Sequence, residues 1–271
     1  MDAIRVTVLR GDVVEAVHHV HARSTDGDAV GEDVHCFLRS SLKPVQAIPL
    51  AEAYDDLGDD ELAIACASHQ AEPAQLAAVR KLLTRAGASV DDLENGEQEG
   101  RPEGRLGHNC SGKHAGMLAA CRAHGWPLHP YRSLDHPLQQ RVSQLVGESS
   151  TAVDGCGVPT FAMPLSRMAD LFVRVPGRIA DAMRTRPELV GGAGADDTDL
   201  MRAKPGWYAK RGAEGLLCAA GDGVAWTLKV EDGNSRALRP ALAFLLGIDE
   251  WREVAVRNSR GEVVGAITLA A

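Results

Sequence analysis

The chain has 271 residues, of which 45% are hydrophobic and 24% charged, as is typical of a globular protein with a sizeable core. Its net charge of -8, with no block of Lys and Arg, excludes a partner bound through a phosphate backbone, so we expect no nucleic-acid ligand. The first residues lack the pattern of a signal peptide and no run of about 18 apolar residues follows, so we expect a cytoplasmic protein without a membrane partner.

The N-terminal region predicts a β-hairpin. Residues 4–9 and 13–20 are rich in β-branched side chains, and Arg10-Gly11-Asp12 between them is a turn signal. Residues 34–38 predict a third strand.

Helices are expected from Ser40 onward. The clearest covers residues 73–86, because its apolar side chains share one face and Gly87 follows as a C-cap. Further helices are predicted over residues 117–124, 137–146 and 165–173. The glycine-rich stretch 190–195 is typical of a surface loop rather than a linker, because helix-like residues resume on both sides.

The C-terminal region returns to strands, predicted over residues 215–220, 224–230, 253–257 and 263–269, with a helix over 235–246. Strands at both termini around a helical block indicate an α+β fold, an α/β sandwich with one antiparallel sheet that both ends join. We therefore predict one domain over 1–271, with a sheet lobe (about 1–39 plus 205–271) and a helical lobe (about 40–204).

Two lysines are candidates for catalysis. On a helix Ser40 and Lys43 share one face, and a lysine in a dry pocket can lose its proton and act as base to a serine. Lys229 lies in an apolar strand just before a turn, where it must be paired or face a cleft. Both patterns have a structural alternative: an N-capping serine with a solvated lysine, and an edge-strand lysine that discourages aggregation.

Cys110 and Cys156 lie in segments rich in polar and metal-capable side chains, HNCSGKH at 108–114 and DGCGVP at 154–159. Two thiolates suit a soft metal such as zinc. Single cysteines so far apart fit buried thiols better on spacing alone, as do the other four cysteines of a chain that has no CxxC pair.

Five segments together resemble, in order and over nearly the whole chain, the signature blocks of the class 3 (Rhizobium etli-type) L-asparaginases. They are RSSLKPVQAIPL from Arg39, ASH from Ala67, HNCSGKHAGML from His108, DGCGVPTFAMPL from Asp154 and KVEDGNSRA from Lys229. The resemblance implies a serine β-lactamase-like fold, a homodimer, and hydrolysis of L-asparagine to L-aspartate and ammonia.

The same resemblance implies the roles of individual residues. Ser40 with Lys43 matches the first Ser-Lys pair of the family, and Ser68 with Lys229 matches the second. The zinc ligands are matched by Cys110, Lys113 and Cys156, and substrate binding is assigned to Arg39, Asn109, His114 and Asp154. Asp154 is also a candidate neighbour of the metal ligands.

The chain departs from the family pattern at three places. The family usually has a small residue, Gly and Glu, then a His, where this chain has Gln70-Ala71-Glu72 and Gln75. A Cys-Gly and a His are absent from residues 94–98, and Ala16 replaces the usual Ser in the block that ends at His18. We expect these changes to affect substrate preference more than the core chemistry.

The expected mechanism is acyl transfer, in which deprotonated Lys43 activates Ser40 to attack the side-chain amide. Ser68 with Lys229 could instead supply the nucleophile or relay protons, and the sequence does not order the two pairs. A glutaminase or related amidase on the same fold is the enzymatic alternative. A non-catalytic zinc-binding or amino-acid-binding homologue is the second.

Overall fold

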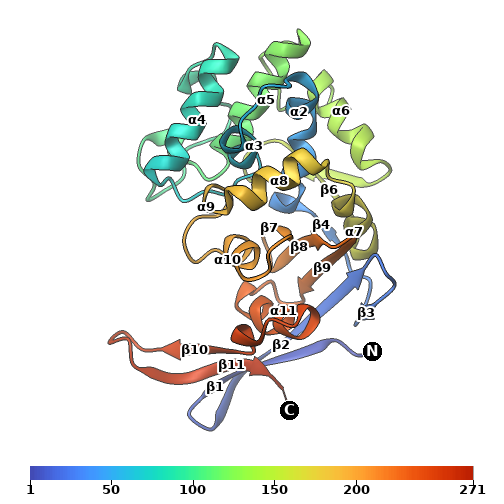
Figure 1. Ribbon diagram of the computed structural model, residues 1–271, viewed down its shortest axis with the longest axis vertical. Helices are drawn as coiled ribbons and strands as arrows, with labels where there is room; N and C mark the ends of the chain where they lie inside the picture. The colour runs from blue at the N-terminus through green and yellow to red at the C-terminus, as the bar shows by residue number, and fades with distance from the viewer. Residues whose placement is uncertain (271) are drawn as a thin grey trace. The chain divides into compact units, whose positions relative to one another are not determined.

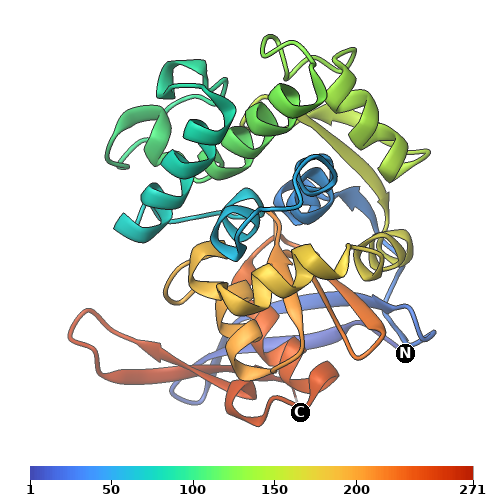
Figure 2. The same cartoon turned by 45° about the horizontal axis from the view of Figure 1, so that its top comes forward.

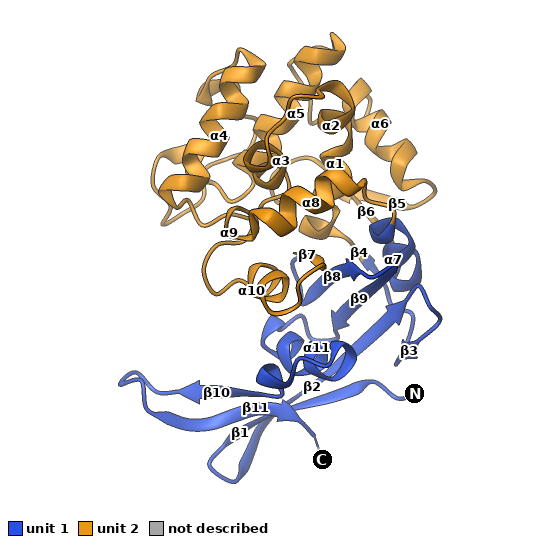
Figure 3. Cartoon of the chain, in the orientation of Figure 1, with its two compact units in different colours: residues 1–36, 164–173, 211–271 blue, residues 37–163, 174–210 orange. Residues whose placement is uncertain are grey.

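The computed structural model describes residues 1–270 and confirms the α+β class (Figure 1). The chain divides into two compact units, the first formed by residues 1–36, 164–173 and 211–271 and the second by residues 37–163 and 174–210 (Figure 3). Segment 164–173, which the sequence groups with the helical lobe, belongs to the first unit. Within residues 1–270, no helix has both the length and the hydropathy needed to cross a bilayer.

The first unit is built on an antiparallel sheet that contains strands from both ends of the chain. In spatial order these are β10 (Glu253–Arg257), β11 (Val263–Leu269), β1 (Ile4–Arg10), β2 (Val13–Ser24), β9 (Val224–Val230) and β8 (Leu216–Gly221), with β3 (Ala29–Val30) beside β2. The ends meet at β1 and β11, where Val6 lies opposite Leu269. The prediction that both ends join one antiparallel sheet is confirmed. The prediction that this is the single sheet is wrong, because residues 150–153 and 159–164 pair in a second sheet.

Alternation along β1 and β2 explains why this sheet has a buried face. Val6 and Val8 of β1 and Val20 and Ala22 of β2 are almost completely buried. Helix α7 (Leu165–Val173) packs on β2, β8 and β9, while α11 (Leu238–Leu246) packs on β1, β10 and β11. A 3₁₀ turn precedes α11 (η4, Ser235–Ala237) and another follows it (η5, Asp249–Trp251).

The second unit is mostly helical. Its helices are α1 (Lys43–Gln46), α2 (Ile48–Ala53), α3 (Asp59–Ala65), α4 (Pro73–Ala86), α5 (Ser111–His124), α6 (Pro137–Val146), α8 (Gly177–Thr185), α9 (Pro187–Val190) and α10 (Asp196–Ala203). Helix α5 packs against α2, α3 and α4, and these helices run from blue to green in Figure 2. The same unit has the 3₁₀ turns η1 (Arg39–Leu42), η2 (Val90–Asp92) and η3 (Gly104–Gly107), and the hairpin β5 (Ser150–Val153) with β6 (Pro159–Pro164). Strands β4 (His35–Phe37) and β7 (Tyr208–Arg211) lie where the chain passes from one unit to the other.

The strongest local patterns fix the element boundaries. Helix α4 has the predicted bounds 73–86 and ends at Gly87, whose φ of +58° is the left-handed C-cap conformation. The stretch 117–124 is the end of a helix that already begins at Ser111. Ser40 does not lie in an α-helix but in the four-residue turn η1, and Pro44 falls in the first turn of α1.

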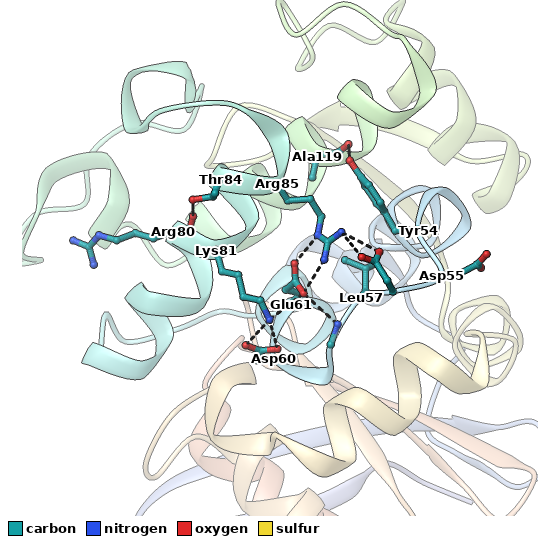
Figure 4. A network of polar contacts seen from close by, with 12 residues as sticks. Tyr54, Asp55, Leu57, Asp60, Glu61, Arg80, Lys81, Thr84, Arg85 and Ala119 are labelled. Carbon is teal, nitrogen blue, oxygen red and sulfur yellow. Dashed lines mark hydrogen bonds and ion pairs between the residues drawn. The ribbon is translucent and has the colours of Figure 1, made fainter.

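A buried carboxylate joins α3 to α4 (Figure 4). Glu61 is 1% exposed at its side chain and accepts hydrogen bonds from Arg85 Nε at 2.7 Å and from the Gly58 N–H at 3.2 Å. Lys81 Nζ lies 3.1 Å from the same carboxylate. The network holds α3, whose C-terminal end leads into the segment of Ser68, against α4.

Candidate active site

Lys43 and Ser68 form the polar contact at the centre of the site. Lys43 is fully buried in α1, and its Nζ donates to the Ala67 carbonyl at 2.5 Å and to Ser68 Oγ at 2.9 Å. Ser68 lies in the segment that follows α3, where its N–H donates to the Val190 carbonyl at 2.8 Å. A buried amine in hydrogen-bond contact with a serine hydroxyl is the geometry required of a base and its proton donor.

The structure therefore pairs Lys43 with Ser68, whereas the sequence pairs Lys43 with Ser40. Ser40 is half-buried, and its hydroxyl makes no hydrogen bond within residues 1–270. Arg39, just before it, has a φ of +48°, a conformation that costs energy in a non-glycine residue and marks functional sites. The Arg39 N–H donates to Thr160 Oγ1 at 3.1 Å, which fixes this turn to β6.

Lys229 belongs to the first unit, and Ser68 to the second. It lies in β9, opposite His21 of β2 and Leu216 of β8, and its amine donates to the Val230 carbonyl. Strand β9 is therefore hydrogen-bonded to another strand on each side and is not an edge strand. The edge-strand alternative for Lys229 is wrong.

His69, which follows Ser68, is used to hold two sequence blocks together. Ser111 Oγ donates to the Leu106 carbonyl at 2.7 Å, so it accepts from His69 Nε2 at 2.8 Å. His69 Nδ1 accepts from the Ala71 N–H at 3.1 Å. Both ring nitrogens are occupied, and burial lowers the pKa of His69 to about 3, so this ring is a neutral structural link and not a proton acceptor.

The departures from the family pattern after Ser68 also have structural roles. Ala71 stands where the pattern has Gly and adopts a φ of +63°, which glycine adopts without strain. Gln75, in place of the following His, accepts from the Gln70 and Glu72 N–H groups at 2.9 and 3.0 Å and donates to the Glu188 carbonyl at 2.9 Å. These bonds tie the segment after Ser68 to α4 and α9.

Cys110, Lys113 and Cys156, which the resemblance gives as zinc ligands, lie in neighbouring segments. Cys110 is the N-cap of α5, Lys113 lies in its first turn, and Cys156 lies in the tight turn between β5 and β6. All three are buried, and Lys113 Nζ lies 2.8 Å from Cys156 Sγ. Gly112 allows α5 to approach α3, because a Cβ there would stand 2.2 Å from the Ile64 carbonyl oxygen.

Neighbouring charges shift the pKa of Cys110 and of Lys113 in this cluster. A hydrogen bond with Cys156, together with the positive charges of Lys43 and Lys113, outweighs burial and lowers the pKa of Cys110 well below its ordinary value. Burial alone would lower the pKa of Lys113, but the two sulfur atoms raise it. The metal-free cluster is therefore a thiolate stabilised by an ammonium group.

Arg39 and Asp154 form an ion pair beside these sulfur atoms. The Arg39 guanidinium donates to the Asp154 carboxylate, which also accepts from the Gly155 N–H at 2.8 Å. Burial would raise the pKa of Asp154, but the charge of Lys113 and the Arg39 bond lower it, so the carboxylate stays ionised. Its Oδ2 lies 4.0 Å from Cys156 Sγ.

The other two residues expected to bind substrate lie at either end of the HNCSGKH block. Asn109 is half-buried, and its Oδ1 lies 3.0 Å from Cys110 Sγ. His114 is fully buried in α5, and its Nδ1 lies 2.8 Å from the Tyr131 hydroxyl. Tyr131 carried no motif or periodic signal in the sequence, so its place beside His114 was not predictable.

The donor set fits a soft metal ion in chemistry. Two sulfur atoms, one of which already favours the thiolate, and one amine lie together with a carboxylate nearby. Within residues 1–270, no group of three or more His, Cys, Asp or Glu side chains has metal-binding geometry. The expected set contains only two such residues, since its third member is a lysine.

The family model described as L-asparaginase II matches residues 6–269, nearly the whole chain. No curated protein matches it.

Proposed function

Because the chain belongs to the L-asparaginase II family, and so to hydrolases that act on amides, we propose that it hydrolyses L-asparagine to L-aspartate and ammonia. The contact between Lys43 Nζ and Ser68 Oγ carries the mechanistic part of the proposal. On the motif order quoted above, we further propose that it is a class 3 enzyme with a serine β-lactamase-like fold.

We assign Ser40 as the nucleophile and Ser68 as the proton relay to Lys43. Ser40 is the more exposed of the two, and its hydroxyl has no hydrogen bond within residues 1–270, so it is free to meet a substrate. Ser68 is 7% exposed and is held by Lys43. A hydroxyl can both accept and donate a proton. The Ser68 hydroxyl can therefore pass the Ser40 proton to the Lys43 amine once substrate is bound.

The reaction proceeds in two halves, acylation of Ser40 and hydrolysis of the acyl-enzyme. Ser40 Oγ attacks the side-chain amide carbon, and its proton reaches neutral Lys43 through Ser68. The C–N bond breaks, Lys43 returns the proton to the departing nitrogen, and ammonia leaves an aspartyl ester on Ser40. Water attacks that ester and loses a proton towards Lys43. The bond between the acyl carbon and Ser40 Oγ breaks, Lys43 returns its proton to Ser40 Oγ through Ser68, and aspartate is released.

Asp154 and Arg39 are suited to the two charged ends of the amino acid. The ionised Asp154 carboxylate can accept from the substrate ammonium group, and the Arg39 guanidinium can donate to the substrate carboxylate. In the absence of substrate, Arg39 and Asp154 form an ion pair with each other. Substrate would exchange one internal ion pair for two new ones, which favours amino acids over simple amides.

Zinc would be held by Cys110, Lys113 and Cys156, because a donor set with two sulfur atoms suits this ion. Bound there, zinc would supply positive charge and orientation close to Asp154 rather than strong Lewis acidity, because two thiolates already neutralise it. Lys113 must lose its proton to become a ligand. We also propose a homodimer, which light scattering of the purified protein tests.

The deciding experiment measures ammonia release from L-asparagine and L-glutamine by wild type and by Ser40→Ala, Ser68→Ala, Lys43→Met and the exposed control Ser133→Ala. We expect asparagine turnover to fall by at least about 10³-fold for Ser40→Ala and Lys43→Met, and by about 10²- to 10⁴-fold for Ser68→Ala. Ser133→Ala should retain wild-type rates. A faster rate on glutamine would reassign the enzyme as a glutaminase.

The nucleophile is identified directly by trapping. A diazoketone analogue of asparagine should label Ser40. Ser40 and Ser68 share the tryptic peptide of residues 40–80, so the labelled serine is located by fragmenting that peptide in the mass spectrometer. Labelling at Ser68 instead would exchange the two roles. Saturable asparagine binding with no ammonia release by folded wild type would overturn the enzymatic proposal altogether.

A further inference from the structure

Asp197 and Lys210 form an ion pair inside the second unit that the proposed mechanism does not use. Asp197 lies in the first turn of α10 and Lys210 in β7, and neither side chain has any exposed area. Lys210 Nζ lies 2.7 Å from Asp197 Oδ2. Two buried charges lose the stabilisation by water, and apolar side chains of similar volume are often at least as stabilising as such a pair. Stability alone therefore does not account for this pair.

Lys210 is connected to the turn that contains Ser40. The Lys210 carbonyl accepts a hydrogen bond from Ser41 Oγ at 2.9 Å, and Ser41 is fully buried. Ser41 follows Ser40 in η1, and its N–H donates to the Leu38 carbonyl at 3.0 Å. Because the backbone and the side chain of Ser41 are both held, the position of η1 depends on the position of Lys210.

Asp197 is connected to the segment that contains Ser68. Its Oδ1 accepts from the Thr198 N–H at 3.0 Å, and the buried Thr198 hydroxyl accepts from the Gly191 N–H at 3.1 Å. A Cβ on Gly191 would stand 2.3 Å from Asp197 Oδ1, so glycine lets this loop lie close to the carboxylate. The carbonyl of Val190, directly before Gly191, accepts from the Ser68 N–H at 2.8 Å. A continuous series of bonds therefore joins the carboxylate to Ser68.

We propose that Asp197 is a positioning residue that fixes the distance between Ser40 and Ser68. Its Oδ2 holds the segment of Ser40 through Lys210. Its Oδ1 holds the segment of Ser68 through Thr198. The inference rests on the proposed function, in which the Ser40 proton passes through Ser68. Such a transfer needs the two hydroxyl groups within hydrogen-bond reach, and a displacement of about 1 Å can cost about 10²-fold in rate.

The first test measures structure and needs no activity. Amide hydrogen exchange, resolved to single residues by fragmentation in the mass spectrometer, is followed at Ser41 and at Ser68. We expect Asp197→Asn, which removes the charge and keeps the shape of the side chain, to raise both rates at least about 10-fold. Glu52→Gln removes an exposed ion pair with Arg141 in the same unit and should leave both rates unchanged.

The pattern of exchange decides between positioning and stability. Rates that rise at Ser41 and Ser68 but much less in α4 support the proposal, because the amides of a long packed helix report global unfolding. An equal rise throughout α4 would mean that the ion pair serves only stability, and would overturn the proposal. So would a rise confined to α10 and β7.

Two smaller changes test the two connections separately, so the inference does not depend on the folding of the carboxylate variant. Ser41→Ala removes the bond to the Lys210 carbonyl, and Thr198→Val removes the bond from the Gly191 N–H at constant volume. We expect Ser41→Ala to accelerate exchange in η1 and not at Ser68. Thr198→Val should do the reverse. Wild-type exchange at Ser68 in Thr198→Val contradicts the proposed connection.

The second test is kinetic and so depends on the proposed function. For L-asparagine hydrolysis we expect kcat to fall about 100-fold in Asp197→Ala and about 10-fold in Asp197→Asn, whose amide oxygen keeps one acceptor. KM should change less than about threefold, because the groups that would bind substrate are untouched. Glu52→Gln should keep the wild-type kcat. A wild-type kcat in Asp197→Ala, or a loss expressed only in KM, overturns the proposal.

Failure of the proposed function is distinguishable from failure of this inference. Wild type that hydrolyses no amide would refute the function. The exchange rates at Ser41 and Ser68 would still decide whether Asp197 holds the two segments at a fixed distance.

Discussion

Gly112 is the residue at which the absence of a side chain matters most. An added Cβ would stand 2.2 Å from the Ile64 carbonyl oxygen and 2.9 Å from Ile64 Cγ1, so the start of α5 or the end of α3 must move. Cys110 and Lys113 lie at that start, and the segment of Ser68 follows α3. One glycine therefore sets the distance between the thiolate cluster and the Lys43–Ser68 contact.

We expect Gly112→Ala to lower the free energy of unfolding by about 3 kcal/mol, at the upper end of the cost of overpacking, because the clash is with backbone. Urea unfolding measures this, and ammonia release should fall with it. Gly177→Ala is the matched control, since nothing lies within 4 Å of its Cβ position and its φ is not positive. Equal stability of wild type and Gly112→Ala would show that α5 can shift freely.

His69 predicts a pH dependence with a defined sign. Its pKa falls from the ordinary 6.5 to about 3 on folding, so between these values the unfolded chain holds a proton that the folded chain does not. Stability is then complete above pH 6.5 and decreases as the pH falls towards 3, by roughly 1.4 kcal/mol per pH unit from this residue.

Unfolding free energies at pH 7, 6 and 5 test this slope. His69→Gln should be less stable than wild type at pH 7, because a bond to Ser111 or Ala71 is lost, yet have a shallower decline with acid. His35→Gln changes an exposed histidine and should keep the wild-type slope. A slope unaffected by His69→Gln would mean that His69 titrates normally in the folded protein.

The contact between α3 and α4 depends on one carboxylate. Burial opposes the ionised form of Glu61, but bonds from Arg85, the Gly58 N–H and Lys81 outweigh it and lower the pKa of Glu61 below 4.5. We expect Glu61→Gln to cost about 2 kcal/mol at pH 7, less than a fully buried pair because Arg85 and Lys81 are partly exposed and Arg85 keeps Asp56.

The sign of the pH effect identifies the cause. The stabilisation by Glu61 is present above pH 4.5 and is lost as the pH falls through the lower folded pKa, so wild type and Glu61→Gln should converge in acid. Denaturant unfolding at pH 7 and pH 3.5 measures the convergence. Asp55→Asn, which changes an exposed carboxylate beside this network, should match wild type at both pH values. A constant difference would point to packing rather than charge.

At the scale of the whole molecule, local patterns were sufficient for most elements and for the class of the fold. The strands 253–257 and 263–269 and the helices 73–86 and 137–146 have their predicted bounds, because each has a clear period and a glycine, proline or turn at its ends. The hairpin β5–β6 and the short helices α8, α9 and α10 were not predicted. The hairpin strands and α9 are six residues long or shorter, too short for a period to emerge, and the three helices lie on either side of the glycine-rich loop.

The candidate active site also contains features that the sequence predicts and others that it does not. Cys110 and Cys156 are candidate soft-metal ligands from their segments, but no spacing joins a turn at 156 to a helix at 110. Their pairing, and Lys113 as a third member, come only from the resemblance. The contact of Lys43 with Ser68 links η1 and α1 to the segment after α3, and the contact of His114 with Tyr131 links α5 to a loop. Such pairings are set by how helices pack, which no local pattern records.

Metal binding should stabilise the unit that contains the cluster, because a ligand set assembled by folding is absent from the unfolded chain. At a free zinc concentration 100 times the dissociation constant, the gain is about 2.7 kcal/mol, or roughly 5–10 °C in the unfolding midpoint. Differential scanning calorimetry with and without zinc measures this shift.

Cys110→Ala and Cys156→Ala should each abolish the zinc-induced shift. Cys121→Ala removes another buried thiol of α5, whose pKa burial raises to about 12, and should lower the midpoint yet keep the full zinc shift. A zinc shift that survives the loss of both Cys110 and Cys156 would place the metal elsewhere on the chain.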